Sequence, residues 1–241
     1  MIRNKPYNHP DFSRIAFVYF DLDDTLIDHK NAQQKAMVDL WTHFPSLQQI
    51  TPQQLATVFA ETNARLWQEY RDREIEQLEL KRKRFVNTFR QLDVDNIDWR
   101  EADKVYMEFY QRHWDWIDDA REAFVRLSKR LPVGVLTNGF TEVQKKKFEH
   151  FSLHRFSSHL IISEEAGYLK PDTRIFKYAA DKVNMDPSRL LYVGDSYSSD
   201  VLGGAKSGWK TAWYTDDGRA GQSCAADLSF SKFCELIKAL S

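Results

Sequence analysis

Cysteine is scarce in this sequence, which has only two, Cys224 and Cys234, among 241 residues. Neither lies in a CxxC pair or beside histidines at metal-ligand spacing, so the sequence disfavours a disulfide framework and a thiolate metal site. We therefore expect free thiols, as in a reducing cytoplasm.

Long apolar runs and an excess of one charge are also absent. No run approaches the ~20 residues that a membrane-spanning helix needs, and the N-terminal stretch MIRNKPYNHPDFSR has no apolar segment of the signal-peptide type. The 34 basic residues nearly balance the 35 acidic ones, so no general field favours nucleic acid or an anionic membrane. The sequence predicts a cytoplasmic protein that binds neither, in which an anionic substrate would need a local site.

What the sequence does contain is a series of short apolar runs, rich in branched and aromatic residues, at Ile15–Phe20, Pro132–Thr137, His159–Ser163, Arg189–Gly194 and Lys210–Thr215. Helical patterns separate the later runs, at Ala120–Arg130, Thr141–Phe151, Arg174–Val183 and Ser198–Ser207. Such runs suit strands buried on both faces, and their alternation with helices is typical of βαβ units. The sequence predicts an α/β fold with a doubly wound parallel sheet, in which ligands bind beyond the carboxyl ends of the strands.

The stretch from residue 28 to residue 117 differs, because it holds amphipathic helical patterns and no convincing strand. One helix is predicted to begin after Thr51, with Pro52 in its first position and Gln54 completing a capping box. We expect residues 28–117 to form an all-helical module, inserted into a core made of residues 1–27 and 118–241.

Two acidic residues, Asp21 and Asp23, come directly after the first predicted strand, in the segment DLDDTL. Residues two apart project to the same side of an extended chain. A carboxylate can attack phosphorus once a divalent cation cancels its repulsion from the phosphate, and magnesium suits such oxygen ligands. The second carboxyl group can give a proton to the leaving oxygen. On these residues alone, an ordinary acidic turn is an equal alternative.

Acidic residues also follow the predicted strand at Arg189–Gly194. Asp195 comes immediately after it, and Asp200 lies five residues further on. Together with Asp21 they could complete an oxygen-only cation site. Without a metal, clustered carboxylates would repel one another and some would stay protonated. The alternative is that Asp195 caps a helix and that Asp200 is solvated.

Two further segments at predicted strand ends could bind phosphate. Thr137, Asn138 and Gly139 offer a hydroxyl group and backbone N–H groups at the start of a helix, although such residues also form ordinary turns. Lys170, followed by Pro171, could neutralise phosphate and orient the nucleophile, although a lone Lys-Pro pair is usually solvated.

The four segments DLDDTL, LTNG, LKP and VGDSYSSD, in this order, resemble the four motifs of the haloacid dehalogenase (HAD) superfamily. The resemblance implies a Rossmann-like core, an inserted C1-type helical cap and an aspartyl-phosphate intermediate. It implies that Asp21 is the nucleophile and Asp23 the acid/base. It further implies phosphate binding by Thr25, Thr137, Asn138 and Lys170. It also implies a Mg²⁺ ion held by Asp21, Asp23 (through its backbone carbonyl) and Asp195, with Asp200 supporting the ion through water or directly.

Asp23 helps to separate the members of this superfamily. The 2-haloacid dehalogenases share the nucleophile but lack the second aspartate, since halide displacement needs no acid. The sequence favours a phosphatase acting on a small phosphorylated metabolite, with a dehalogenase, a sugar phosphomutase and a catalytically silent binding protein as alternatives. The stretch from LTNGF to ISEEAGYLKP resembles bacterial pyrimidine 5'-nucleotidases, which implies a nucleoside 5'-monophosphate as substrate. The protein is expected to be a monomer or a homodimer.

A lysine cluster lies in the polar helical pattern after the second motif, at Lys145, Lys146 and Lys147. We interpret this cluster as a solvated helix face rather than as part of a binding site.

Overall fold

The computed structural model describes residues 11–215 and 225–241, which include Cys234 as a free, exposed thiol but leave Cys224 outside. The chain divides into two compact units. The larger unit comprises the residues up to Ile27 and from Trp116 onward, and the smaller unit comprises Asp28–Asp115. The chain passes between the units twice, and Ile27 and Trp116 form an antiparallel bridge at this point.

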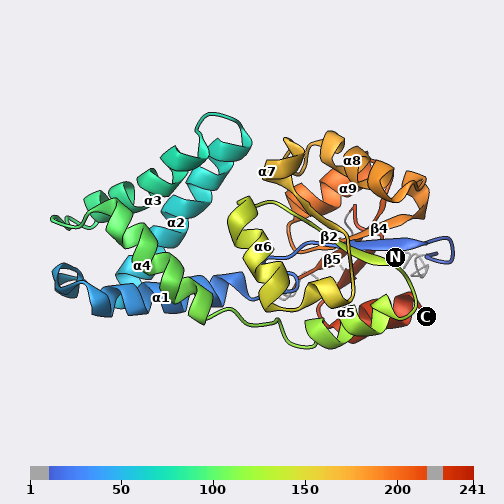
Figure 1. The fold of residues 1–241 in the computed structure, drawn as a ribbon, viewed down its shortest axis with the longest axis horizontal. Coiled ribbons are helices and arrows are strands. Elements are labelled where there is room, and N and C mark those ends of the chain that lie inside the picture. Colours follow the sequence, from blue (N-terminus) through green and yellow to red (C-terminus); the bar gives the residue numbers. More distant parts are fainter. Residues whose placement is uncertain (1–10, 216–224) are drawn as a thin grey trace, which may run out of the picture. The chain divides into compact units, whose positions relative to one another are not determined.

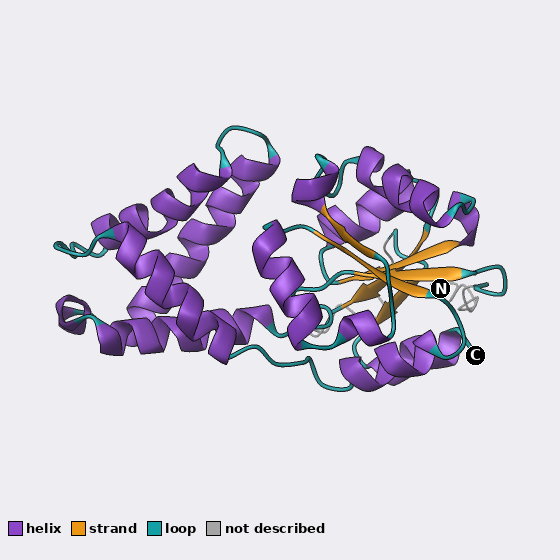
Figure 2. Cartoon of the chain, viewed as in Figure 1, coloured by secondary structure: helices purple, strands orange, loops and turns teal. Residues whose placement is uncertain are grey.

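The larger unit contains a parallel sheet, whose strands are orange in Figure 2. Within the described residues the strand order is β3-β2-β1-β4-β5-β6. The strands are β1 (Phe17–Phe20), β2 (Val133–Thr137), β3 (Leu160–Ile162), β4 (Leu190–Gly194), β5 (Lys210–Tyr214) and β6 (Leu228–Phe230). This arrangement confirms the predicted doubly wound α/β core.

The first strand of the sequence lies at the centre of the sheet. In β1, Val18 pairs with Val133 of β2 on one side and with Leu191 of β4 on the other. All four residues of β1 are buried, as its continuous apolar sequence requires. Successive strands are added on one side of β1 as far as β3, and β4, β5 and β6 are added on its other side. The carboxyl ends of β1, β2 and β4 therefore meet at this change of side, where α/β sheets bind ligands.

Helices cover both faces of this sheet. Figure 1 shows α8 and α9 on one face and α5 and α10 on the other. The helices of the larger unit are α5 (Ala120–Ser128), α6 (Thr141–His150), α7 (Ser163–Ala166), α8 (Thr173–Val183), α9 (Leu202–Lys206) and α10 (Phe233–Ala239). A π-helical turn at Tyr197–Val201 precedes α9.

A cluster of buried aromatic residues joins α8 to the sheet. The ring of Phe176 lies 5.4 Å from that of Tyr192 and 5.5 Å from that of Trp209. The Tyr19 hydroxyl group of β1 donates a hydrogen bond to the Ala179 carbonyl oxygen at 3.2 Å. Because rings of this size remove large apolar areas from water, this cluster fixes α8 on the central strands.

The smaller unit is all-helical, as the sequence predicts. Its helices are α1 (His29–His43), α2 (Pro52–Arg71), α3 (Gln77–Gln91) and α4 (Trp99–Arg112), with a 3₁₀ turn at Pro45–Gln49. The predicted capping box is confirmed: the Gln54 N–H donates to Thr51 Oγ1 at 3.1 Å, and the Thr51 N–H donates to Gln54 Oε1 at 2.9 Å. The rings of Phe59, Phe85 and Tyr106 pack 5.2 to 5.7 Å apart in its core.

The structure differs from the prediction near the C-terminus. The sequence patterns do not predict β6 or α10, because three and seven residues are too few to display a clear period. The helix predicted at Ser198–Ser207 consists of the π-helical turn followed by α9. None of the helices in the described part of the chain is long and apolar enough to cross a membrane.

The aromatic cluster leads to a stability prediction. Phe176→Ala should lower the free energy of unfolding by about 3–5 kcal/mol, because the buried ring leaves a cavity between α8 and the sheet. Tyr178→Ala, two residues along the same helix, serves as the control, since Tyr178 is 37% exposed and should cost less than about 1 kcal/mol. Urea denaturation of both variants checks the difference. Equal losses would contradict this account of the core.

Candidate active site

The end of β1 places Asp21 and Asp23 at the edge of the sheet. The Asp21 N–H donates to the Val193 carbonyl oxygen of β4 at 2.8 Å, so Asp21 continues the ladder by one residue. The chain then turns, with Asp24 at a φ of 59° and its N–H bonded to the Ile27 carbonyl oxygen at 2.7 Å. This turn ends the strand immediately after the first carboxylate.

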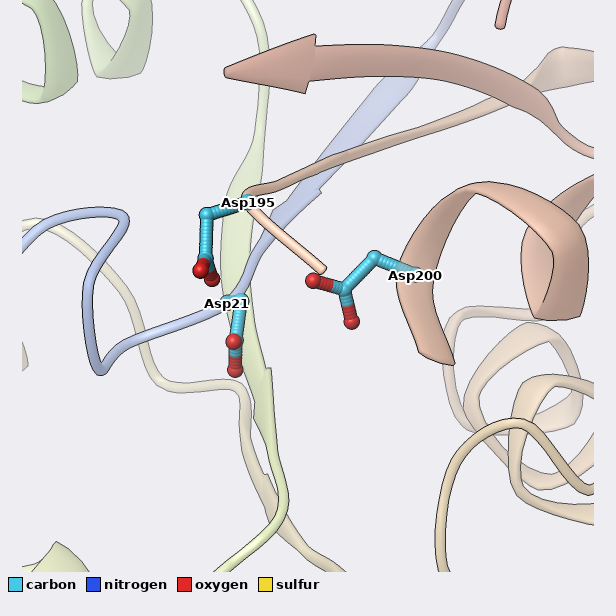
Figure 3. A group of neighbouring side chains, drawn as sticks. All are labelled: Asp21, Asp195 and Asp200. Atoms are coloured by element: carbon cyan, nitrogen blue, oxygen red, sulfur yellow. The ribbon is translucent and has the colours of Figure 1, made fainter. Parts of the chain in front are cut away.

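Three carboxylates converge at this edge, as Figure 3 shows. Asp21 follows β1, Asp195 follows β4, and Asp200 lies in the π-helical turn. One oxygen from each lies within 4.8 Å of the others. The structure therefore brings together three of the predicted metal ligands, from two strand ends and one turn.

Asp200 reaches this cluster through a close backbone approach. Its Oδ2 atom accepts a hydrogen bond from the Ser196 N–H at 2.9 Å. A Cβ atom at Gly194 would collide with the Asp200 carboxylate. The glycine at the end of β4 is thus required because a buried carboxylate lies directly against the strand. Asp200 is buried rather than solvated, and Ser196 takes the helix-capping role considered for Asp195.

Lys170 is the cation of the cluster. Its Nζ atom lies 2.8 Å from both Asp21 Oδ1 and Asp200 Oδ1, and it donates to the Tyr192 hydroxyl group at 2.6 Å. Burial alone would lower the pKa of Lys170, but the charges of Asp200 and Asp21 raise it above its usual value. Lys170 is therefore charged at neutral pH and is not a solvated lysine.

The Lys170 backbone is held by a side chain of the neighbouring strand end. The Lys170 N–H donates to Asn138 Oδ1 at 2.9 Å, and Asn138 Nδ2 donates to the Lys170 carbonyl oxygen at 3.0 Å. The Asn138 amide is thus engaged in orienting Lys170. The predicted phosphate contact of Asn138 stays a prediction, and its backbone remains the group that could make it.

The electrostatics of Asp21 reflect this crowding. Burial raises the pKa of Asp21 to about 7, the charge of Lys170 opposes this, and the charges of Asp200 and Asp23 add to it. Lys170 Nζ and Asp21 Oδ1, 2.8 Å apart, form a close ion pair. Among the described contacts, Lys170 is the one ammonium group set against three carboxyl groups, whose oxygen ligands fit a hard divalent cation such as Mg²⁺.

Two predicted phosphate ligands, Thr25 and Thr137, also lie at this edge. The Thr25 hydroxyl group donates to Asp195 Oδ1 at 3.3 Å. Thr137, the last residue of β2, is fully buried, and its Oγ1 atom accepts a hydrogen bond from Gln144 Nε2 at 2.8 Å. Thr25 therefore orients Asp195 in this structure, and phosphate binding by either threonine stays a prediction.

The interpretation of the lysine cluster is correct for two of its three members. The side chains of Lys145 and Lys146 are 56% and 50% exposed, but that of Lys147 is 2% exposed and its Nζ atom pairs with Asp23 Oδ1. Successive residues of a helix are about 100° apart around its axis, so three in a row cannot share one face. The spacing of Lys147 from Gln144, one turn earlier, is the signal that could have placed it inward.

The sequence of this chain matches the profile of the haloacid dehalogenase-like hydrolases over residues 18–214. This range runs from the second residue of β1 to the end of β5 and includes every candidate site residue, so the chain belongs to that family. The resemblance inferred from the four motifs is thereby confirmed.

Named relatives give a finer comparison. Pyrimidine 5'-nucleotidase YjjG of Escherichia coli (strain K12) is 30% identical over 200 residues, covering 82% of this chain and 84% of the relative. Glyceraldehyde 3-phosphate phosphatase of Pyrococcus furiosus is 28% identical over 231 residues, covering 93% and 89%. The structure of YfnB from Bacillus subtilis, solved bound to magnesium, has a TM-score of 0.80 at 24% identity and covers 95% of this chain and 99% of its own. The last comparison supports the fold.

The raised pKa of Asp21 leads to a prediction about magnesium and pH. A carboxyl group whose folded pKa lies above its usual 3.8 stabilises the metal-free fold at low pH, and this contribution is lost as the pH rises towards about 7. Mg²⁺ binds the ionised carboxylate and should restore stability mainly in the upper part of this window. We expect saturating Mg²⁺ to raise Tm by roughly 5 °C at pH 8 and by less than half as much at pH 5.

Asp21→Asn provides the control for this experiment. Without metal at pH 8, this variant should melt at a higher temperature than the unmodified protein, because the amide removes a buried charge. Thermal unfolding followed by circular dichroism measures both effects. An equal magnesium effect at the two pH values would show that Asp21 does not control metal binding.

Proposed function

We propose that this protein is a Mg²⁺-dependent phosphatase that hydrolyses a small phosphomonoester through a covalent intermediate on Asp21. The observation that carries the proposal is that two neighbouring carboxyl groups, those of Asp21 and Asp23, have different partners. Asp21 lies among Lys170, Asp195 and Asp200, whereas Asp23 contacts Lys147 and Gln144. One group is thus suited to nucleophilic attack beside a metal, and the other to proton transfer.

The residues support a two-step reaction with balanced proton transfers. In the first step, an Asp21 carboxylate oxygen forms a bond to phosphorus and the ester P–O bond breaks. Asp23, which takes up a proton from solvent before this step, gives that proton to the departing oxygen. In the second step, Asp23 takes a proton from a water molecule that attacks phosphorus, which releases inorganic phosphate and restores the Asp21 carboxylate. Lys170 and the phosphate contacts predicted for Thr25, Thr137 and the Asn138 backbone hold the phosphoryl oxygens during both steps.

Asp21, Asp195 and Asp200 would hold the magnesium ion through carboxylate oxygens, together with the Asp23 backbone carbonyl that the family resemblance implies. When bound, the ion supplies positive charge that cancels the repulsion between the carboxylate cluster and the phosphate. The three carboxyl groups set against Lys170 among the described contacts support this assignment.

The alternatives are less consistent with the site. A dehalogenase displaces halide from carbon and has no use for the proton donor Asp23. A silent binding protein has no need for a cluster of three carboxylates, two of them buried, that repel one another. A sugar phosphomutase needs the same pair of aspartates, but it also needs residues that hold and re-present a sugar phosphate, and no described residue is identified in that role.

We also propose that the substrate is a nucleoside 5'-monophosphate. Support comes from the E. coli relative, a pyrimidine 5'-nucleotidase, which is 30% identical over most of both chains. The P. furiosus relative is named for glyceraldehyde 3-phosphate at similar identity, so a three-carbon sugar phosphate is the competing substrate. A cytoplasmic location and a monomeric or homodimeric state stay predictions from the sequence.

Replacing the proposed nucleophile tests the reaction. The unmodified protein should release phosphate from p-nitrophenyl phosphate with Mg²⁺ and not with excess EDTA. Asp21→Asn should lower kcat by more than about a thousandfold. Asp24→Asn is the matched control, because it makes the same replacement three residues away in a turn position that asparagine tolerates. Full activity in Asp21→Asn, or halide release from a 2-haloacid without metal, would refute the phosphatase assignment.

A substrate panel tests the finer proposal. We expect kcat/KM to be at least about tenfold higher for a pyrimidine nucleoside 5'-monophosphate than for glyceraldehyde 3-phosphate, which corresponds to about 1.4 kcal/mol of transition-state binding. Phosphate release measured with both compounds at several concentrations gives the ratio. The reverse preference would assign the protein to sugar phosphates and leave the role of Asp21 intact.

A further inference from the structure

Lys147 is a buried lysine whose role the proposed reaction does not yet explain. Its side chain is 2% exposed and its ammonium group pairs with Asp23 Oδ1. Removing an ammonium group from water is costly unless a charged partner compensates. The burial of Lys147 is therefore tied to the presence of Asp23.

Gln144 approaches the same carboxyl group from one turn earlier in α6. Its Nε2 atom donates to Asp23 Oδ2 at 3.0 Å and to Thr137 Oγ1 at 2.8 Å. Lys147 and Gln144 thus contact different oxygens of Asp23 and fix the plane of its carboxyl group. Gln144 also links Asp23 to Thr137, the last residue of β2.

The backbone leaves room for this arrangement. A Cβ atom at Gly139 would lie 2.7 Å from Gln144 Nε2 and 2.8 Å from its Cδ and Cγ atoms. Real Cβ atoms do not approach so closely, so the Gln144 side chain occupies the space that a glycine provides. The conformation of Gln144 is consequently set by packing as well as by its hydrogen bonds.

We propose that Lys147 and Gln144 are positioning residues that hold the Asp23 carboxyl group in the orientation needed for proton transfer. This inference rests on the proposed phosphatase function and adds to it two residues that have no role in the two-step reaction above. Lys147 is too buried to contact the substrate and acts through Asp23. A different orientation of the Asp23 carboxyl group would place its oxygen away from the departing group, and small misplacements of this kind lower rates strongly.

The leaving group provides a sensitive test of such a role. A p-nitrophenolate ion departs without a proton, whereas the alkoxide of a nucleoside 5'-monophosphate requires one from Asp23. In single-turnover experiments with Lys147→Met, the first step should slow by on the order of tenfold with the nucleotide and by less than about twofold with p-nitrophenyl phosphate. KM should change less than about twofold, because no substrate contact is lost.

A double-mutant cycle with Asp23→Asn tests whether Lys147 acts through Asp23. In the Asp23→Asn background, Lys147→Met should not slow the first step any further. The coupling between the two substitutions should therefore equal the whole tenfold effect that Lys147→Met has alone. Additive effects of the two substitutions, or equal slowing with both leaving groups, would overturn the proposal. Lys146→Met is the matched control, since the 50% exposed Lys146 pairs with Glu142 on the outer face of α6.

Lys147→Arg covers the possibility that Lys147→Met does not fold. This variant keeps the positive charge and should keep at least about a third of the rate with the nucleotide. If neither variant folds by circular dichroism, Lys147 is required for the fold and the positioning role is overturned. An unmodified protein that releases no phosphate from any ester would instead refute the proposed function itself, which separates the two failures.

Discussion

The repulsion among carboxylates crowded at one edge of the sheet is the constraint on which the rest of the site depends. One oxygen atom from each of Asp21, Asp195 and Asp200 lies within 4.8 Å of the other two. Lys170 forms ion pairs with Asp21 and Asp200. The surrounding structure is organised around this charge. Gly194 admits Asp200 and the Asn138 side chain fixes Lys170. Among the described contacts the carboxyl groups outnumber the ammonium groups, and their oxygens are ligands that suit a divalent cation.

The sequence predicted the positions of the acidic and basic residues at the strand ends better than it predicted their partners. Asp21, Asp195 and Lys170 follow apolar runs whose continuity indicates buried strands, and parallel strands bring their carboxyl ends together. The inward position of Lys147 was missed, because a run of three lysines resembles a solvated face unless each is placed around the helix. The hydrogen bonds from Thr25 to Asp195 and between Asn138 and Lys170 depend on backbone turns that no sequence period reveals.

Two of the relatives carry names of enzymes that hydrolyse phosphate esters, but they are named for different substrates. The E. coli and P. furiosus relatives carry the names of a nucleotidase and a sugar phosphate phosphatase, at nearly equal identity to this chain. A nucleophile, an acid/base and a cation site can serve any phosphomonoester, because they recognise the phosphoryl group alone. Differences among these proteins must therefore arise from side chains that contact the rest of the substrate.

The central position of β1 also affects how the chain folds. Val18 finds its partners at Val133 and Leu191, more than a hundred residues later in the sequence. During synthesis β1 emerges before both of its neighbouring strands, β2 and β4, so its edges are at first unpaired. The helices α1 to α4 can already pack against one another through contacts within Asp28–Asp115. Such long-range pairing slows folding and leaves an apolar, aggregation-prone strand exposed to neighbouring chains. The strand that ends beside Asp21 is thus also the segment of the core most dependent on protection before the sheet forms.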